Sequence, residues 1–561
     1  MKIGTREFGG MVPRAEPHLL TESQAQLASN SKIWRGGLQP LRLISFIANL
    51  AKVGTIRTIY RFGQNLDSDT QYWFHWLNDT NATTGPIPDD PNERTYYTEA
   101  GQPPKVTDLS IALGGTSYPV ISYLLGIPTP LLQAITVTGG TADTGAIAQT
   151  TSVVYTYVSG WGEEGPPSAA STLFSLTNGQ YLTVQNMSGP PSGAYNIVSK
   201  RIYIGQTAGG VQNYTFWTEV PVGTAVTTAA FNFGQLAESL PNPYLSPPPS
   251  DLFGLLAHPN GFLVGFSGKR ICRSEVNRPH GWPDAYKDPV SHNIVGGAII
   301  GSSLVVCSTK DTYIAVGTDP INFQIIKLEI EQPCVSKRSI VAADGAVLYA
   351  SPDGLISVSA SGAAVNITQN IFTPDQWQEF KPESISAYFF KGSYLAFYDN
   401  GIVQAGFVID ALQSEVYYLN FYATAGYSDP RRNALFLAQG QQVMRFDPPI
   451  AVNSQAMLWR SKKYIMDTRT TFGAARVIAT AYPLTLRLYC DNVLVHTQIV
   501  TSKDIFSLAM GYRAREAYYE LATAITTSIQ ECLIVTQSNE FKEAPYSGPR
   551  PGILQSDYMR P

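Results

Sequence analysis

The sequence predicts an all-β protein: a β-propeller core of about six blades, an inserted fibronectin III or immunoglobulin-like β-sandwich, and a short helical extension at the N-terminus. The first observation behind this prediction is a repeat of a short apolar strand pattern, a turn with Gly or Asp, and a second strand pattern. Its steps are 42, 43, 47 and 41 residues, counted between the leading apolar residues Phe262, Leu304, Val347, Tyr394 and Leu435. Propeller blades repeat every ~40–50 residues, so the repeat predicts successive blades.

The composition is the second observation. Of the 561 residues 44% are hydrophobic and only 15% are charged, with 31 Tyr, 24 Phe, 47 Gly and 38 Pro. A typical soluble domain has roughly 25% charged residues. Low charge with many turn-forming residues indicates a loop-rich all-β chain, and tyrosine is enriched at protein interfaces. We therefore expect an obligate oligomer.

The third observation is a segment that interrupts the repeat. In TSVVYTYVSGWGEEGPPS, which begins at Thr151, Tyr155 and Tyr157 alternate with Thr156 and Val158 as in a half-buried strand. Further strand patterns follow up to Phe233, over a length typical of a fibronectin type III or immunoglobulin-like sandwich. We interpret this segment as a domain inserted between blades.

These patterns divide the chain into six parts. The predicted parts are an N-terminal extension (1–44), a first propeller part (45–128), the inserted sandwich (129–246), propeller blades (247–450), a closing blade or C-terminal sandwich (451–543), and a C-terminal arm (544–561). In the extension, a helix is predicted within Pro17–Ser29 because Thr21 and Gln24 have capping-box spacing. Its apolar stripe would be Leu19, Leu20, Ala25 and Leu27.

Charge and cysteine usage exclude several classes of protein. The net charge of −4 and the absence of a long basic run argue against ordinary nucleic-acid binding. The five cysteines form no CxxC pair, which argues against a metal knuckle and for synthesis in a reducing cytoplasm. We expect neither a secretory signal nor a transmembrane helix. Three pairs of adjacent basic residues could contact phosphates or could be ordinary surface charges; these are Lys337-Arg338, Arg431-Arg432 and Lys462-Lys463.

The search for catalytic motifs predicts no catalytic residue, cofactor or metal. None of the six histidines lies in an HExxH motif, and His75, between Phe74 and Trp76, is interpreted as a packing residue. Acids for a propeller glycosidase could come from Asp344, Asp353 and Asp410. Asp344 and Asp353 each precede glycine, which favours hairpin turns. A cation could bind Asp67, Asp69 and Asp79, although solvated loop carboxylates are the simpler interpretation.

Residues 288–377 carry a family resemblance. The runs DPVSHNIVGGAIIGSSLVVCSTKDTYIAVGTDP and EQPCVSKRSIVAADGAVLYASPDGLISVS, with the later FTPDQW, resemble phage tail nozzle proteins of the tail tubular protein B type. The opening GGMVPRAEPHLLTESQAQLASNSKIWRGGLQPLR is similar to the start of that family. The resemblance covers most of the chain, but the segment 129–246 departs from the plainest family members.

The resemblance implies a propeller-based homohexameric nozzle in the virion tail, assembled in the host cytoplasm. The implied partners are the head-to-tail adaptor above the ring and tail fibres, a spike or a needle around or below it. Double-stranded DNA would pass through the lumen without sequence-specific binding. A slightly acidic chain is consistent with such a conduit, because a basic lumen would retain phosphate.

Two other function classes remain open, and each has candidate residues. A receptor- or glycan-binding tail protein would use the inserted sandwich for host attachment, with Trp161 and Trp217 stacking on sugar, unless both belong to the sandwich core. A propeller-based polysaccharide depolymerase would depend on Asp353. For the nozzle, the residues expected at subunit contacts are Arg14, Trp34 and Arg35.

Overall fold

The computed structural model describes residues 1–34, 37–63, 68–208, 211–234, 237–241, 244–410, 414–450 and 453–541. The described chain is mostly β-structure with many four-stranded antiparallel sheets, as the sequence predicts. It forms two compact units: unit 1 is Met1–Leu43, Gln413–Asn420 and Pro449–Pro561, and unit 2 is Ile44–Leu412 and Phe421–Pro448. No helix in these described ranges is long and apolar enough to cross a membrane.

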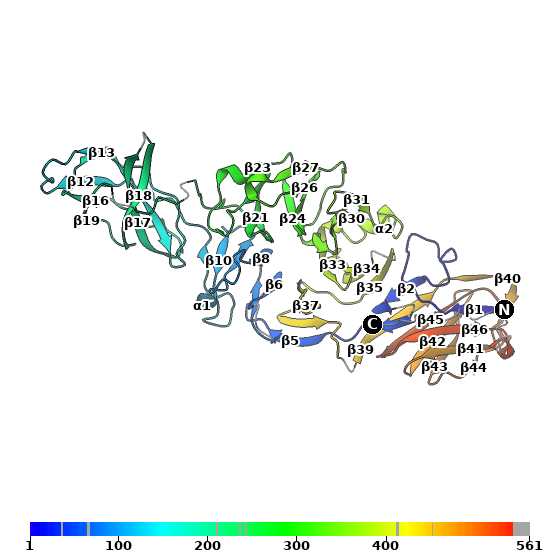
Figure 1. Ribbon diagram of the computed structural model, residues 1–561. Helices are drawn as coiled ribbons and strands as arrows, with labels where there is room; N and C mark the ends of the chain where they lie inside the picture. The colour runs from blue at the N-terminus through cyan, green and yellow to red at the C-terminus, as the bar shows by residue number, and fades with distance from the viewer. Residues whose placement is uncertain are drawn as a thin grey trace, which may run out of the picture. The chain divides into compact units, whose positions relative to one another are not determined.

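Unit 2 contains a closed ring of antiparallel sheets (Figure 1). In ring order the sheets are β8–β11 (Thr80–Thr84, Thr95–Glu99, Lys105–Thr107, Tyr123–Leu124), β20–β23 (Phe253–His258, Phe262–Ser267, Arg270–Arg273, Lys287–Pro289), β24–β27 (Ile294–Ile300, Ser303–Ser308, Thr312–Val316, Gln324–Lys327), β28–β31 (Val341–Ala343, Ala346–Ser351, Gly354–Ser359, Ala364–Asn366), β32–β34 (Ser386–Phe390, Ser393–Asp399, Gln404–Asp410), β36–β38 with β5 (Ala425–Asp429, Ala434–Gln439, Gln442–Phe446, Ser45–Asn49), and β6–β7 (Thr58–Arg61, Trp73–Trp76). The first strand of each sheet contacts the first strand of the next, and β6 contacts β8 to complete the ring. The two short α-helices are α1 (Leu109–Ala112) and α2 (Pro374–Gln378).

The sequence repeat corresponds to the second strands of successive ring sheets. Its five leading residues lie on β21, β25, β29, β33 and β37, and each is 0% exposed. Strand β25 shows why both strand faces are apolar: Leu304 and Val306 pack with the sheet before it, whereas Val305 and Cys307 pack with the sheet after it. Because side chains alternate along a strand, a strand between two sheets must be apolar at every position. The prediction of successive repeated β units is therefore confirmed.

The last ring sheet combines strands from distant parts of the sequence. Its outer strand is β5, and Ala48 of β5 pairs with Val443 of β38 in antiparallel register. The chain just before β6 therefore completes the sheet made by residues 425–446. This pairing joins the start and end of the ring through backbone hydrogen bonds.

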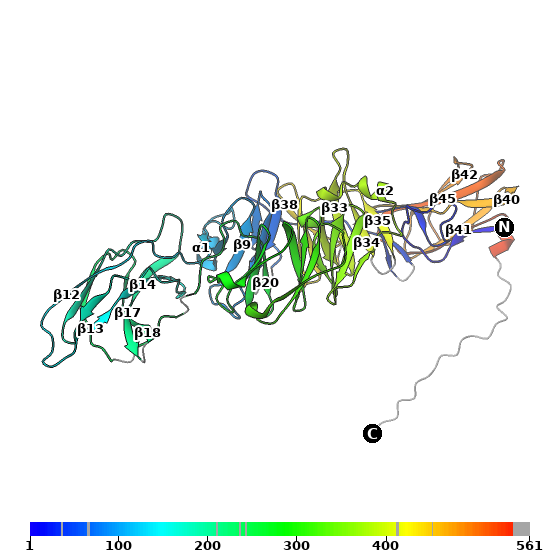
Figure 2. The ribbon, with the colours of Figure 1, turned by 90° about the horizontal axis from the view of Figure 1, so that it is seen from above.

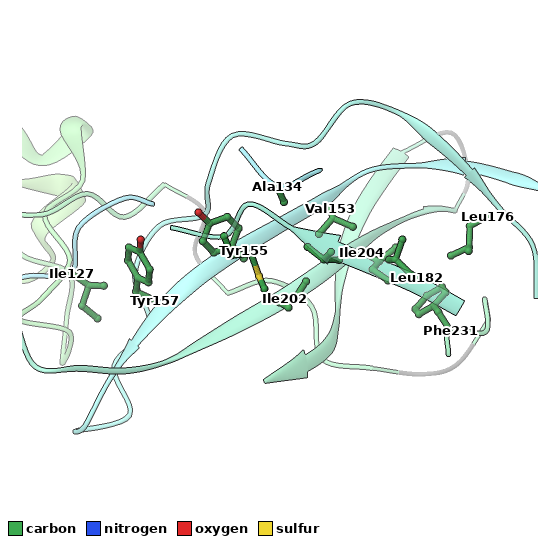
Figure 3. Packing of buried hydrophobic residues seen from close by; sticks show 12 residues of the cluster. Ile127, Ala134, Val153, Tyr155, Tyr157, Leu176, Leu182, Ile202, Ile204 and Phe231 are labelled. Carbon is green, nitrogen blue, oxygen red and sulfur yellow. The ribbon is translucent and has the colours of Figure 1, made fainter. Parts of the chain in front are cut away.

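The segment predicted as an insertion forms two three-stranded sheets and a two-stranded one. The sheets are β12-β16-β19 (Ile135–Gly139, Tyr181–Gln185, Thr227–Ala230), β14-β17-β18 (Val153–Ser159, Ile197–Ala208, Val211–Pro221) and β13-β15 (Gln149–Thr151, Phe174–Leu176). The two larger sheets share one apolar core, with Val153, Tyr155 and Ile202 contributed by one and Leu182 by the other (Figure 3). Tyr155 and Tyr157 both lie in this core, but β14 is buried at every position and is not the half-buried strand that the alternation predicts.

Unit 1 joins the N-terminal strands to the C-terminal part of the chain. One sheet has the order β3-β4-β46-β41-β44, with β1 also paired to β46 (Ser31–Trp34, Gly37–Pro40, Ile529–Val535, Ala474–Ala479, Phe506–Ser507; β1 is Lys2–Thr5). The second has the order β35-β2-β39-β45-β42-β43, with β40 paired to β45 (Glu415–Leu419, Ala25–Ser29, Asn453–Ser461, Ala514–Ile525, Leu484–Cys490, Val493–Val500; β40 is Tyr464–Thr470). Figure 2 shows β40, β41, β42 and β45 of this unit. The segment 1–44, predicted as an N-terminal extension, contributes β1, β2, β3 and β4 to these sheets.

The predicted N-terminal helix is wrong, because the chain forms turns and then β2 there. The Thr21 N–H donates to Gln24 Oε1 at 3.1 Å and the Gln24 N–H donates to Thr21 O at 3.2 Å, so the expected capping pair closes a turn. The chain then extends as β2, in which Ala25 and Ala28 are 1% and 0% exposed. Pairing of β2 with β39 supplies ladder hydrogen bonds and burial. A short isolated helix is marginal in water, so this tertiary pairing outweighs the local pattern.

Candidate functional site

A cavity of about 390 Å³ lies inside the ring of first strands. It is lined by β8, β20, β24 and β28 and by Lys337 and Ile340. Small residues dominate the walls, including Gly254, Gly297 and Ala342, so backbone atoms form much of the surface. The cavity is therefore a narrow space with few side chains able to carry chemistry.

Two adjacent basic residues connect different sheets beside this cavity. Lys337 Nζ donates to Asp79 Oδ2 at 2.8 Å, just before β8, and lies 6.0 Å from the Phe253 ring centroid. Arg338 Nη2 donates to Thr424 O at 2.8 Å, just before β36. Both cations thus have partners within the protein, which favours a structural role for this basic step over phosphate contact. Sequence reasoning missed Asp79 and Thr424 as partners because both are distant along the chain.

A buried charge cluster joins the ring to the inserted sheets. Arg94, which precedes β9, donates through Nε to Asp90 Oδ2 and through Nη1 to Glu163 Oε1, each at 2.6 Å. His280 Nδ1 lies 3.4 Å from Glu163 Oε1. Burial alone would raise the pKa of Glu163, but His280 and Arg94 outweigh it and lower that pKa.

Trp161 belongs to the same junction. Its indole Nε1 donates to Asp108 Oδ2 at 3.0 Å, the Arg94 guanidinium carbon lies 5.3 Å from the ring centroid, and Tyr123 packs edge-on against the ring. Asp108 is fixed in turn because its other oxygen accepts from the first turn of α1. The Trp161 ring is half-buried and engaged in internal packing, and its role as a surface sugar contact stays a prediction.

Trp217 occupies a different position, at the edge of the inserted sheets. It is half-buried against their core, and its Nε1 donates to Ala230 O of β19 at 3.3 Å. Its role as a ligand contact stays a prediction. The uncharged outer face of β12, β16 and β19, next to this edge, was not singled out from the sequence.

Lys52 lines a second cavity of unit 2, of about 380 Å³, with Glu99 and Lys105. Its Nζ donates to His75 O at 2.6 Å and to Tyr118 O at 3.1 Å. Burial lowers the pKa of Lys52 to about 8, partly offset by the charge of Glu99. The low pKa makes this amine unlike an ordinary surface lysine.

The residues predicted for subunit contacts are only partly described. Arg14 is exposed in unit 1. Trp34 is the last residue of β3, and its side chain lies outside the described structure. Arg35 lies outside the described residues. Their role at an interface therefore stays a prediction.

The aspartates considered for catalysis or cation binding lie, where the structure describes them, in turns, at a strand end or in ion pairs. Asp344 lies in the turn between β28 and β29, and Asp353 in the turn between β29 and β30, so the hairpin interpretation is confirmed. Asp410 ends β34. Asp69 Oδ2 lies 3.1 Å from Arg445 Nη1, and Asp67 is outside the described residues. Nowhere in the described chain do three or more His, Cys, Asp or Glu side chains form a group that could hold a metal ion.

His75 is internal, as predicted, and the cysteines are internal too. His75 is 1% exposed, and its Nε2 accepts from the Lys52 N–H at 3.1 Å. Burial lowers the pKa of His75. All five cysteines are buried free thiols.

Comparison with known proteins assigns no family. No protein-family model and no curated protein matches the chain. Among solved structures, it is similar to the WD40 domain of Neurospora crassa Pan2, with 8% identity and a TM-score of 0.27 over 50% of this chain and 86% of that one. BamB from Moraxella catarrhalis gives 11% identity and a TM-score of 0.26 over 66% and 98% of the two chains. PorZ, a surface component of the type-IX secretion system of Porphyromonas gingivalis, gives 10% identity and a TM-score of 0.27 over 88% of this chain and 83% of that one. At these TM-scores the likeness assigns neither an architecture nor a function.

Proposed function

We propose that this protein is a structural component of a phage tail, forming a ring-shaped nozzle below the portal–adaptor complex through which genomic DNA is ejected. In this proposal the ring of sheets is a β-propeller and residues 129–246 are an inserted sandwich. The sequence resemblance of residues 288–377 and of the N-terminal run supports the proposal. Its partners would be further copies of the chain, the adaptor, and fibres, a spike or a needle.

The structural observation that carries the proposal is the exposed apolar edge of unit 1. Strand β43 lies at the end of its sheet, and its Val493 and Ile499 side chains are 63% and 62% exposed. Nearby in the sequence, Met510 is 74% exposed. Edge strands normally carry charge or cover because an apolar edge promotes association. Such an edge is therefore consistent with a chain that is covered by another subunit.

The contacts of Lys337 and Arg338 bear on where DNA would pass. They connect the sheets of a single subunit beside its central cavity, which has a volume of only about 390 Å³. B-DNA, whose major groove alone is about 12 Å wide, cannot enter such a space. The conduit would therefore be the lumen enclosed by several subunits.

Light scattering combined with negative-stain imaging tests the proposal, on the purified protein alone and mixed with adaptor rings. A sixfold ring with a central channel, formed alone or on the adaptor, is the expected result. A trimer would instead support a spike or receptor-binding protein. A monomer that does not assemble on adaptor rings would overturn the nozzle proposal.

A further inference from the structure

The outer face of the sheet β12-β16-β19 is an uncharged surface built around one tyrosine. Leu182 and Val184 point into the core and are each 0% exposed (Figure 3 shows Leu182). Because side chains alternate along a strand, Tyr181 and Thr183 point to the opposite face. Tyr181 is 46% exposed there.

The Tyr181 ring lies against the backbone of two glycines. Tyr181 pairs with Gly139 of β12. A Cβ atom added to Gly139 would lie 2.5 Å from Tyr181 Oη and 2.6 Å from Cζ, and one added to Gly140 would lie 3.0 Å from Cδ1. Contacts at both edges of the ring mean that one ring face covers the Gly139–Gly140 peptide. The other face is left toward solvent, and only glycine at both positions permits this arrangement.

The neighbours of Tyr181 on this face are apolar or hydroxylated. Ile135 and Val137 of β12 are 53% and 49% exposed. Thr183 and Thr228 are paired across the strands, with their hydroxyl oxygens 2.8 Å apart. None of the residues of β12, β16 and β19 is charged. The face thus combines an aromatic platform, aliphatic groups and hydroxyl groups in one plane.

We propose that this face binds a neutral pyranose polysaccharide, with a sugar ring stacked on Tyr181. The C–H face of a pyranose is apolar and matches an exposed aromatic ring, while its hydroxyls match those of Thr183 and Thr228. Lack of charge favours a neutral ligand over an anionic one, because no cation is present on the three strands to pair with a carboxylate. The proposal does not depend on ring assembly.

The site differs from the one expected from sequence. Trp161 and Trp217 were the predicted sugar contacts, yet Trp161 packs in the junction and Trp217 is half-buried at the sheet edge. Tyr181 was overlooked because its neighbour Gly139 is in contact only through strand pairing. The signals present in the sequence were the Gly139-Gly140 pair and the lack of charge in both strand patterns.

Binding of the full-length protein to an array of neutral and anionic pyranose glycans tests the proposal. Binding is expected on neutral glycans, with Tyr181→Phe retaining it because the ring remains. Tyr181→Ala should weaken it about tenfold, the scale of one lost stacked aromatic contact. Gly139→Ala should weaken it as well, because the new Cβ displaces the ring, whereas Gly223→Ala, whose Cβ meets nothing within 4 Å, should not.

Three results would overturn the proposal. The first is no binding to any neutral glycan, and the second is unchanged binding by Tyr181→Ala. The third is that the parent protein binds no glycan and Tyr181→Ala forms a smaller oligomer than the parent. This result would mean that the face is a contact between copies of the chain. Equal melting temperatures of Tyr181→Ala and Tyr181→Phe, measured in parallel, show that any difference in binding is not a folding defect.

Discussion

Arg61 and Asp429 form a buried ion pair between the two ring sheets that lie next to each other in space but at opposite ends of unit 2 in sequence. Arg61 Nη1 donates to Asp429 Oδ2 at 3.1 Å, and the two side chains are 1% and 0% exposed. Arg61 ends β6 and Asp429 ends β36. The pair therefore stabilises the same junction that β5 closes through its pairing with β38.

Removal of one partner of this pair should destabilise unit 2 strongly. Asp429→Asn keeps the shape of the side chain but takes the Asp429 charge away from the buried Arg61 guanidinium, which costs ~3–5 kcal/mol. Asp284→Asn is the matched control, because Asp284 is 88% exposed and pairs with Lys287 on the surface; its expected cost is below ~1 kcal/mol. Urea denaturation measures both free energies of unfolding, and equal costs would contradict the importance of the buried pair.

The junction between the ring and the inserted sheets should lose stability in acid. The pKa of Glu163 is lowered from its ordinary 4.5, because His280 and Arg94 together outweigh the opposing effect of burial. The unfolded state then binds more protons over this range, so the contribution of Glu163 is complete above pH 4.5 and is lost as pH falls through the lowered pKa. Glu163→Gln should reduce the loss of stability between pH 7 and pH 3. Melting temperatures of the parent protein and of Glu163→Gln, measured over this pH range, test the prediction. Parallel curves of melting temperature against pH for the two proteins would contradict it.

Lys52 should make the protein more stable as pH rises into the alkaline range, which is the same sign of pH dependence as for Glu163. Its pKa is lowered from 10.5 to about 8, mainly by burial. Between these values the unfolded state binds more protons at Lys52 than the folded state, so the free energy of unfolding should rise with pH. Lys52→Met should remove this rise. The difference between the two proteins across pH 7.5–10.5 isolates Lys52 from other titrating groups, and an unchanged slope would argue against a perturbed lysine.

Local periodicity was sufficient to predict the repeated sheets. The residues Phe262, Leu304 and Val347 lie at the first or second position of second strands, and a strand buried on both faces produces an uninterrupted apolar run between turns. The hairpin at Asp353 was predicted from another local signal, the glycine that follows this residue. Each of these features depends on neighbours within one or two strands of the sequence.

Pairings between distant segments could not be predicted in this way. The sequence of β2 alone resembles part of an amphipathic helix, and only its pairing with β39 makes it a strand. Likewise, nothing in the sequence of β5 indicates that it pairs with β38. The candidate sites also depend on such contacts between distant segments. Trp161 was recognised as an aromatic residue in a turn, but its partners Arg94 and Asp108 come from another sheet. Tertiary pairing, which adds backbone hydrogen bonds and burial, decides all three cases.

Trp161 should behave as a structural residue. Trp161→Phe removes the hydrogen bond to Asp108 and should cost ~1 kcal/mol, whereas Trp161→Ala also removes the packing with Tyr123 and Arg94 and should cost ~3 kcal/mol. Neither change should alter binding to neutral glycans. Denaturation curves and the glycan array test the two halves of this prediction. Loss of glycan binding with unchanged stability would restore Trp161 as a ligand contact.

The exposed edge of unit 1 makes the assembly proposal testable with one substitution. Ile499 is 62% exposed on β43, so Ile499→Lys should change the stability of the subunit by less than ~0.5 kcal/mol. If another copy covers β43, the new charge is buried at the contact without a partner, and the ring should dissociate or fail to form. Ile402→Lys is the matched control, because Ile402 of unit 2 is 92% exposed. Light scattering on the adaptor-bound protein measures the result. Intact rings with Ile499→Lys would show that β43 faces solvent in the assembly and that the subunit contacts lie elsewhere.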